Sequence, residues 1–258
     1  MIFDAHCHIN DSPESVNIDA IIQAAIKAGL RGAMIGGVEP AEWQRQKHLQ
    51  QSYPNFIFCN FGIHPWTVAK NDDDTLSDMF SKLKLDLSKV AALGECGLDF
   101  YEKGQSIEDE TKQIKWLTLQ MQLAMSSKKP IVLHKVKAHS QMIKALEPYN
   151  ALRGIVHGWT GPEDHTQDYQ KKGLLFGIGP RYLKCKAARS DKPKFSLSEF
   201  CIESDGPFKK HEIPDGQTWV DDLNRTAQFL ADQFQVSRSQ IWSQNAENLR
   251  KAGFDFLV

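Results

Sequence analysis

The sequence predicts a (β/α)8 TIM barrel, and two observations carry this prediction. Eight short apolar runs recur along the chain, with amphipathic stretches of helical length between them. Most of these runs are almost continuously apolar rather than alternating, which is typical of parallel strands that are covered on both faces. Strand–helix alternation of this kind over 258 residues fits one such barrel. A doubly wound open sheet is the main alternative.

The elements can be placed in order along the chain. The expected strands are residues 2–5, 32–36, 56–62, 90–94, 130–133, 154–156, 174–178 and 200–202. The first helix is expected to follow the capping residue Asn17 and to end at Gly29. The expected helices are residues 18–28, 107–127, 137–146, 218–233 and 237–252.

The organisation of the chain indicates one domain over residues 1–258. No linker rich in proline, glycine and serine divides the sequence. Residues 179–198 are unusually basic and have few apolar periodic positions, so they are expected to form a loop and a short helix over the barrel mouth.

Composition and charge narrow the classes of function. The formal net charge is −1, so no long-range basic field attracts nucleic acid, and any such contact has to be local. Five cysteines without a C-x-x-C pair indicate free thiols in a reducing cytoplasm. The amino terminus lacks the pattern of a signal peptide. No run approaches the roughly 20 apolar residues of a membrane span. We therefore expect a cytoplasmic protein with no membrane contact.

Two histidines at the end of the first strand are the first candidate site residues. His6 and His8 flank Cys7, and alternation along a strand places both imidazoles on one face and the thiol on the other. Imidazole is the commonest metal ligand in proteins. The two histidines can therefore bind one divalent ion. Cys7 points to the opposite face and is not counted as a ligand.

Further histidines and carboxylates follow the other expected strands. In a (β/α)8 barrel, the carboxyl ends of the strands meet at one face, which carries the chemistry. These residues can hold two divalent ions that share one carboxylate, with Mg, Mn and Zn as candidate metals. The strand-end residues are His6, His8, His64, Glu95, His134, His157 and Asp205.

Six segments carry a family resemblance. They are FDAHCHI, FGIHPW, LGECGLDF, VLHK, IVHGWTG and CIESDGP, and a QNAEN segment follows them near the end of the chain. In this order they resemble the successive motifs of the TatD-type metal-dependent deoxyribonucleases, which belong to the amidohydrolase-like barrels. The resemblance runs from residue 2 to about residue 252. It implies the barrel fold and hydrolysis with metal-activated water.

The resemblance also implies roles for the strand-end residues. The first metal site would comprise His6, His8, Glu95 and Asp205, and the second would comprise Glu95, His134 and His157, with Glu95 bridging. Asp205 would orient or deprotonate the attacking water, and His64 would contact the scissile phosphate. The catalytic set is therefore Asp205, Glu95 and His64.

The substrate-facing residues depart from the family pattern. Members often have H-S-R after the fifth strand, whereas this chain has valine at the arginine position, Val136. Lys135 and Lys137 are the candidates to supply a phosphate contact there, as less directional point charges. No arginine-rich segment follows Asp205, and residues 212–217 stand in its place. Trp159 is a further candidate substrate contact.

Several nearby residues have both a structural and a functional interpretation. Asp4 can orient a ligand or be hydrogen-bonded for structure, and Glu203 shares a strand face with Asp205. Aromatic residues near the strand ends can stack a nucleobase or pack in the core. These aromatics are Trp66, Phe100, Tyr101 and Trp159, and the histidines expected to be ordinary surface or helix residues are His48, His139, His165 and His211.

Two function classes follow, and a third is disfavoured. The first is a deoxyribonuclease that cleaves phosphodiester bonds of single-stranded DNA in the manner of a 3′–5′ exonuclease. The alternative is a metallohydrolase of a small ester, amide or phosphate substrate in a closed pocket. A non-catalytic partner protein is disfavoured because every proposed metal ligand is present. No obligate protein partner is evident from the sequence.

Overall fold

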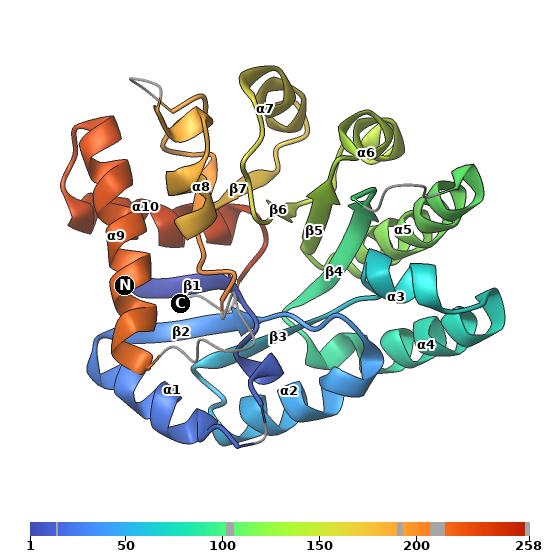
Figure 1. Ribbon diagram of the computed structural model, residues 1–258, viewed down its shortest axis with the longest axis horizontal. Coiled ribbons are helices and arrows are strands. Elements are labelled where there is room, and N and C mark those ends of the chain that lie inside the picture. The colour runs from blue at the N-terminus through green and yellow to red at the C-terminus, as the bar shows by residue number, and fades with distance from the viewer. Residues whose placement is uncertain (14, 102–105, 190–192, 207–214, 256–258) are drawn as a thin grey trace.

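The computed structural model describes residues 1–13, 15–101, 106–189, 193–206 and 215–255. Its eight strands are parallel and form one sheet in the order of the chain (Figure 1). They are β1 (Ile2–Cys7), β2 (Leu30–Ile35), β3 (Ile57–Phe61), β4 (Ala92–Asp99), β5 (Ile131–Val136), β6 (Gly154–Val156), β7 (Leu175–Ile178) and β8 (Phe200–Ile202). All eight expected strands are thus present.

Backbone hydrogen bonds just beyond the strand ends bring β8 against β1. The amide of Asp205 donates to the carbonyl oxygen of His6 at 2.9 Å, and the amide of His8 donates to the carbonyl oxygen of Gly206 at 2.6 Å. The sheet therefore curls into a nearly closed barrel, which confirms the (β/α)8 prediction over the open sheet. That the whole chain is one domain stays a prediction.

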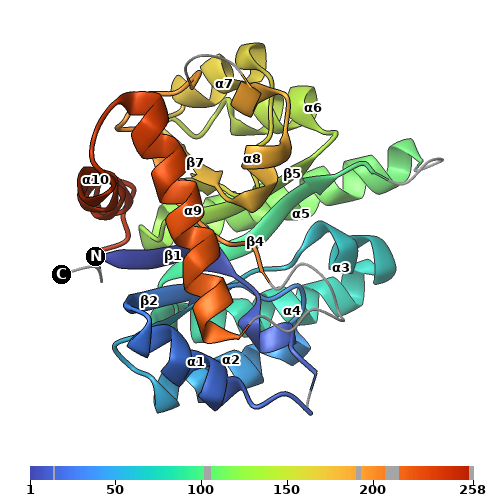
Figure 2. The same ribbon diagram turned by 60° about the vertical axis from the view of Figure 1, so that its left-hand side comes forward.

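Helices surround the sheet in the expected alternation (Figures 1 and 2). The five predicted helices are α1 (Ile18–Lys27), α5 (Ile107–Ser127), α6 (His139–Leu146), α9 (Gly216–Phe234) and α10 (Arg238–Lys251). The structure also contains helices that the sequence pattern does not predict: α2 (Pro40–Ser52), α3 (Pro65–Lys70), α4 (Asp73–Asp86) and α7 (Glu163–Gln170). The apolar pattern of α2 is weak, because the helix buries only Trp43 and Gln46.

Local sequence signals set the helix boundaries. The side chain of Asn17 accepts a hydrogen bond from the amide of Ala20, and Gly29 follows the helix with a φ of +105°. At the start of α5, Ser106 and Asp109 form a reciprocal capping box. These caps fix where α1 and α5 begin.

The buried side chains form an outer and an inner layer. The outer cluster lies between sheet and helices and contains Cys7, which confirms that this thiol points away from His6. The inner cluster includes Val132 and Ile155, each two residues before a histidine of the same strand face. The barrel interior is therefore apolar at its lower end and polar at the carboxyl ends of the strands.

The basic segment 179–198 forms a short helix over part of its length. Helix α8 spans Pro180–Lys184, a 3₁₀ turn spans Ala187–Arg189, and residues 190–192 lie outside the described part. In the described ranges, no helix combines the length and the apolar character needed to cross a bilayer.

Candidate metal centre

Glu95 lies between two groups of histidines at the carboxyl ends of the strands. Its Oε2 atom is 3.4 Å from Nε2 of His6 and 3.4 Å from Nε2 of His8. Its Oε1 atom is 2.9 Å from Nδ1 of His134 and 2.5 Å from Nε2 of His157. One carboxylate thus presents one oxygen to each group, which is the arrangement of a bridging ligand.

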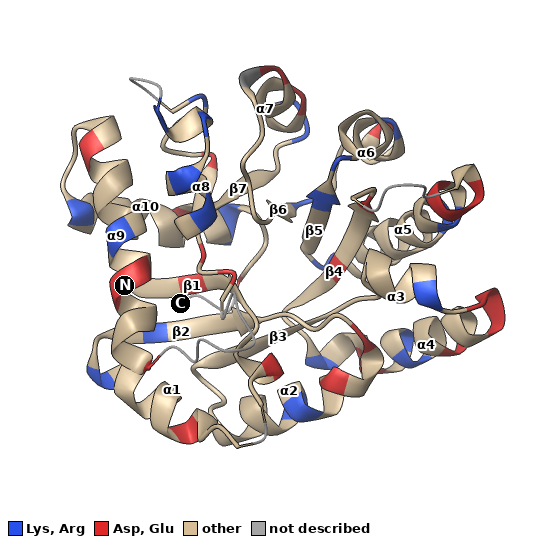
Figure 3. Cartoon of the chain, in the orientation of Figure 1, with Lys and Arg blue, Asp and Glu red and all other residues tan. Residues whose placement is uncertain are grey.

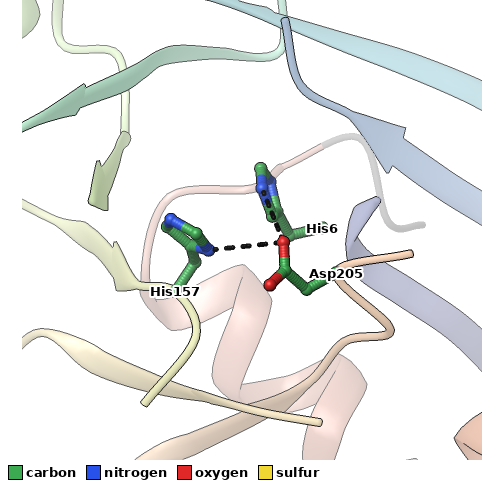
Figure 4. Close-up of side chains that lie close together, drawn as sticks. All are labelled: His6, His157 and Asp205. Carbon is green, nitrogen blue, oxygen red and sulfur yellow. Dashed lines mark ion pairs between the residues drawn. The ribbon is translucent and has the colours of Figure 1, made fainter. Parts of the chain in front are cut away.

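Asp205 completes the group around His6 and His8. Its Oδ1 atom lies 3.9 Å from His6 Nε2 and 3.6 Å from His8 Nε2. It also lies 3.9 Å from Nδ1 of His157, so it joins the two groups (Figure 4). The backbone of Asp205 has a φ of +52°, a left-handed conformation that Asp tolerates better than most residues. We call these six residues, His6, His8, Glu95, His134, His157 and Asp205, the histidine–carboxylate cluster.

The donor atoms of the cluster fit divalent cations. The Nε2 atoms of His6 and His8 are only 3.1 Å apart, and both face carboxylate oxygens. Metal bonds of roughly 2 Å bring ligand atoms to about this separation. Among the described residues, three groups of potential ligand atoms lie within 4.8 Å of one another: His6, His8 and Glu95; His6, His157 and Asp205; and His64, Glu95 and His134. The chain therefore holds a cluster able to bind metal, as the sequence analysis expects.

Electrostatics keep the carboxylates of the cluster ionised. Burial acts to raise the pKa of Glu95, but the imidazoles of His157 and His134 hold that pKa well below its usual range. Burial opposes ionisation of Asp205 in the same way, and His157, His6 and His8 lower its pKa. Burial, with the nearby His157, lowers the pKa of His6 to about 4. Burial acts to lower the pKa of His134 as well, but its hydrogen bonds to Asp99 and Glu95 raise that pKa to about 9, and Asp11 and Glu95 raise the pKa of His8 against burial. Without a cation the cluster is thus a network of imidazole–carboxylate pairs, and metal binding would release the protons that these imidazoles hold.

His64 lies beside the cluster but differs from the ligand candidates in its hydrogen bonding. Its Nδ1 atom accepts a hydrogen bond from the amide of Trp66 at 3.1 Å and so caps α3. Burial and the nearby His134 lower its pKa to about 4, so the ring is neutral and carries its proton on Nε2. That Nε2 atom lies 3.6 Å from Oε1 of Glu95. In this tautomer Nε2 can donate a hydrogen bond towards the centre, and it would have to lose that proton to act as a ligand in the group that His64 forms with Glu95 and His134.

Asp99 orients His134, a role the sequence analysis did not assign. Its Oδ2 atom is 3.0 Å from Nε2 of His134 and accepts a hydrogen bond from the indole of Trp66 at 2.8 Å. The amide of Asp99 is itself held by Gln113 of α5. This carboxylate–histidine pair leaves Nδ1 of His134 facing Glu95. The available signal was the spacing GECGLD, which returns Asp99 to the cluster's side of β4.

Asp4 and Glu203 are buried beneath the cluster. Asp4 accepts hydrogen bonds from the hydroxyl of Ser204 and the indole of Trp219, so it fastens the end of β8 and α9 to β1. Oε1 of Glu203 accepts from the amide of Gly158 at 2.5 Å. Burial and the nearby Asp205 raise the pKa of Glu203 well above its usual value. Both acids support the positions of the cluster residues from below.

The structure corrects the expectation that Trp159 contacts substrate. Its side chain is only 2% exposed, because its ring packs against Tyr169 and Phe176 in the outer core. The ammonium group of Lys135 lies 5.0 Å from the centroid of that ring. Trp159 therefore helps to position Lys135 through a cation–π contact and does not itself face solvent.

The exposed aromatics at the mouth are Trp66 and Tyr101. They are 51% and 65% exposed, respectively. Lys137, the other lysine proposed from the sequence, holds its ammonium 4.4 Å from the centroid of the Tyr101 ring. These aromatics, with Lys135 and Arg181, form a set that we call the rim.

A hollow of about 430 Å³ opens above the cluster, and we call it the mouth hollow. His64, Glu95, His134, His157 and Asp205 lie in its floor or wall, which brings the predicted site residues together in one place. Arg181 of α8, which the sequence analysis did not single out, also lines it.

The remaining histidines lie outside the cluster in the described part of the chain. His48 is exposed on α2, and His139 and His165 stack on each other with ring centroids 3.5 Å apart. His139 also pairs with Asp168. The expectation that they are ordinary surface or helix residues agrees with these positions, and His211 lies outside the described residues.

The fold and the cluster together define a class: barrel hydrolases whose histidines and carboxylates bind metal at the carboxyl ends of the strands. The family model of TatD related DNase matches residues 3–252. The chain therefore belongs to the TatD-related DNase family, as the motifs predict, and this is a family of metal-dependent hydrolases.

Two relatives agree with this assignment, and a solved structure matches the fold. The chain is 30% identical over 212 residues to the "3′-5′ ssDNA/RNA exonuclease TatD" of Edwardsiella piscicida, covering 80% of each protein. It is 28% identical over 208 residues to the "uncharacterized metal-dependent hydrolase YjjV" of Escherichia coli, covering 79% of this chain and 78% of that one. The crystal structure of YjjV matches the fold with a TM-score of 0.81 at 23% identity, over 97% of each chain.

Proposed function

We propose that the chain is a two-metal phosphodiesterase that acts on single-stranded DNA in the manner of a 3′–5′ exonuclease. The observation that carries the proposal is Glu95, whose two oxygens face two separate groups of histidines. His6, His8, Glu95 and Asp205 would hold one ion, and Glu95, His134 and His157 the other. Divalent ions at such a site, with Mg, Mn and Zn as candidates, polarise a phosphoryl oxygen and lower the pKa of a water.

Asp205 is proposed to orient the attacking water and to accept its proton. Its lowered pKa keeps the carboxylate ionised, and its Oδ1 atom faces the cluster. The ion pair between its Oδ2 atom and Arg181 leaves Oδ1 free to face the cluster. A carboxylate held in this way can bind the water in one orientation for in-line attack on phosphorus.

His64 is proposed to donate a hydrogen bond from Nε2 to the scissile phosphate. The amide of Trp66 occupies Nδ1, so the proton on Nε2 faces the mouth hollow. A donor already placed where negative charge develops stabilises the transition state, and its removal typically costs about 10²–10³ in rate. The hydrogen bond that occupies Nδ1 supports the choice of His64 as a phosphate contact rather than a metal ligand.

Single-stranded nucleic acid is the proposed substrate because of the rim and the relatives. Trp66 and Tyr101 offer exposed rings on which a base can stack, and Lys135 and Lys137 stand beside them. Several family relatives carry the name "3′-5′ ssDNA/RNA exonuclease TatD". The net charge of −1 means that this attraction is local to the mouth. We further propose a cytoplasmic location, supported by five free cysteines.

The test is hydrolysis of 5′-labelled single-stranded oligonucleotides with Mg²⁺ or Mn²⁺. The proposal expects stepwise shortening from the 3′ end, loss of activity in EDTA, and strong loss in Asp205→Asn. His64→Ala should keep its bound metal and lose turnover, whereas loss of metal would make His64 a ligand and unchanged turnover would make it structural. If oligonucleotides stay intact while small esters, amides or phosphate esters are cleaved, the alternative metallohydrolase function is correct.

A further inference from the structure

A second, smaller hollow lies next to the mouth hollow. It measures about 210 Å³, and we call it the side hollow. Four residues line both spaces: His134, Val136, His157 and Arg181. The two hollows are therefore neighbours on the protein surface, and a flexible ligand in the mouth hollow would reach the side hollow across these shared residues.

The two hollows differ in charge. Three cationic side chains line the side hollow, Lys135, Lys137 and Arg181, and its lining within the described ranges contains no Asp or Glu. The mouth hollow instead carries several carboxylates, Asp99 and Asp205 among them. Figure 3 shows the basic segments at the end of β5 and on α8. The side hollow is thus suited to an anion, and it lies directly beside the place where a phosphodiester would react.

Arg181 lines both the mouth hollow and the side hollow. Its Nη1 atom lies 3.3 Å from Oδ2 of Asp205, and its side chain is 58% exposed. Gly158, which has a φ of +60°, lies beside it: a Cβ there would be in ordinary van der Waals contact with Nη1, at 4.0 Å. A guanidinium has five N–H donors, so the contact with Asp205 leaves donors for a phosphate oxygen. Val136, where the family resemblance places an arginine, lines the same wall.

The two lysines are held in place by aromatic rings. Lys135 lies over Trp159 with its ammonium 5.0 Å from the ring centroid, and Lys137 lies over Tyr101 at 4.4 Å. Trp159 is part of the packed core, so the ring that faces the Lys135 ammonium is itself held in place. These contacts reduce the entropy that each lysine would lose on binding an anion.

We propose that the side hollow binds a second phosphate of the substrate, next to the scissile one, with Arg181 as the main donor and Lys135 and Lys137 beside it. The proposal rests on the proposed function and makes the substrate more specific: a strand with a phosphate beyond the bond that is cut. That phosphate is the next internucleotide diester or a terminal monoester.

The test compares TpT, pTpT and TpTpT as substrates with Mn²⁺. The wild-type kcat/KM for the substrates with a second phosphate is expected to exceed that for TpT by about tenfold, the scale of one charge-assisted contact. Arg181→Ala should abolish most of this ratio. A gain with pTpT alone identifies the terminal monoester, and a gain with TpTpT identifies the next diester. Arg225→Ala, an exposed ion-paired arginine of α9, is the matched control and should keep the ratio.

A binding measurement complements the kinetics. Affinity for fluorescein-labelled dT12 is measured in EDTA over a series of salt concentrations, so that neither turnover nor metal enters. Arg181→Ala and Lys137→Ala should each reduce the slope of log K against log salt by about 0.7, the value for one phosphate contact on a single strand. Equal kcat/KM for all three substrates, or an unchanged ratio and slope in Arg181→Ala, would overturn the proposal. If none of the three substrates is cleaved but the slope falls in Arg181→Ala, the proposed function fails and the phosphate site stands.

Discussion

The cluster and the rim lie within one mouth but are held in different ways. Each cluster residue stands on a strand or directly after one, is almost fully enclosed, and has its ring or carboxylate fixed by neighbours of opposite charge. Rim residues such as Trp66 and Arg181 stand on short helices and are more than half exposed. The difference indicates that the reaction is built into the barrel, whereas the choice of substrate depends on loops and helices above it.

The largest effect is expected from the centre of the cluster. Glu95→Gln removes the charge that both histidine groups share. Turnover should fall by more than about 10³-fold, because the removal of a single stabilising group typically lowers the rate by about 10²–10³. Metal content by mass spectrometry should fall with it. The control is Glu108→Gln on the exposed start of α5, and retained metal with wild-type turnover in Glu95→Gln would disprove the bridging role.

A smaller effect is expected one step outside the cluster. Asp99→Asn weakens the partner that holds the ring of His134, and such partners typically contribute about 10–100-fold to metal affinity or activity. Asp168→Asn is a matched control, since Asp168 pairs with His139 in the same way outside the cluster. Metal titration of both variants tests the prediction, and equal losses in the two would remove the special role of Asp99.

At the rim, changes should act on substrate binding. Trp66→Leu removes an exposed ring, and the KM for oligonucleotides should rise about tenfold, in the range of one base-stacking contact. Trp66→Phe keeps a ring but loses the hydrogen bond to Asp99, so it separates stacking from orientation of His134. Steady-state kinetics decide the matter: a fall in kcat with unchanged KM in Trp66→Leu would place Trp66 with the cluster.

The smallest effect concerns Glu42, in the first turn of α2. Burial first, and then the charge of Asp11, raise its pKa to about 7 from 4.5. Because the folded pKa is the higher one, its contribution to stability is present below about pH 4.5 and is lost as the pH rises through about 7. Because Glu42 is partly exposed, solvent screening reduces the stability lost on its ionisation to about 1 kcal/mol at pH 8.

Glu42→Gln keeps an acceptor for the amide of Val38 and cannot ionise. In urea unfolding with EDTA, the variant should match the wild type at pH 4.5 and be more stable by about 1 kcal/mol at pH 8. The same stability difference at both pH values would contradict the raised pKa.

The sequence predicts the cluster better than the rim for a physical reason. Strand periodicity and the barrel rule alone bring His6, His134 and Asp205 to one edge, because parallel strands end together. The positions of the rim residues depend on how the helix after each strand packs, and strand periodicity does not predict that packing. Arg181 was therefore missed, and Trp159 was placed in the mouth although its ring fills the core. Helix α2 is only weakly amphipathic, so its apolar periodicity does not predict it either.

The central claim is that two cations flank Glu95, and anomalous X-ray scattering from crystals soaked in Mn²⁺ tests it most directly. The account predicts two anomalous peaks about 4 Å apart. One should lie among His6, His8, Glu95 and Asp205, and the other among Glu95, His134 and His157. Both should disappear in crystals of Glu95→Gln soaked in the same way. A single peak that does not touch Glu95, or peaks only outside the cluster, would contradict the account.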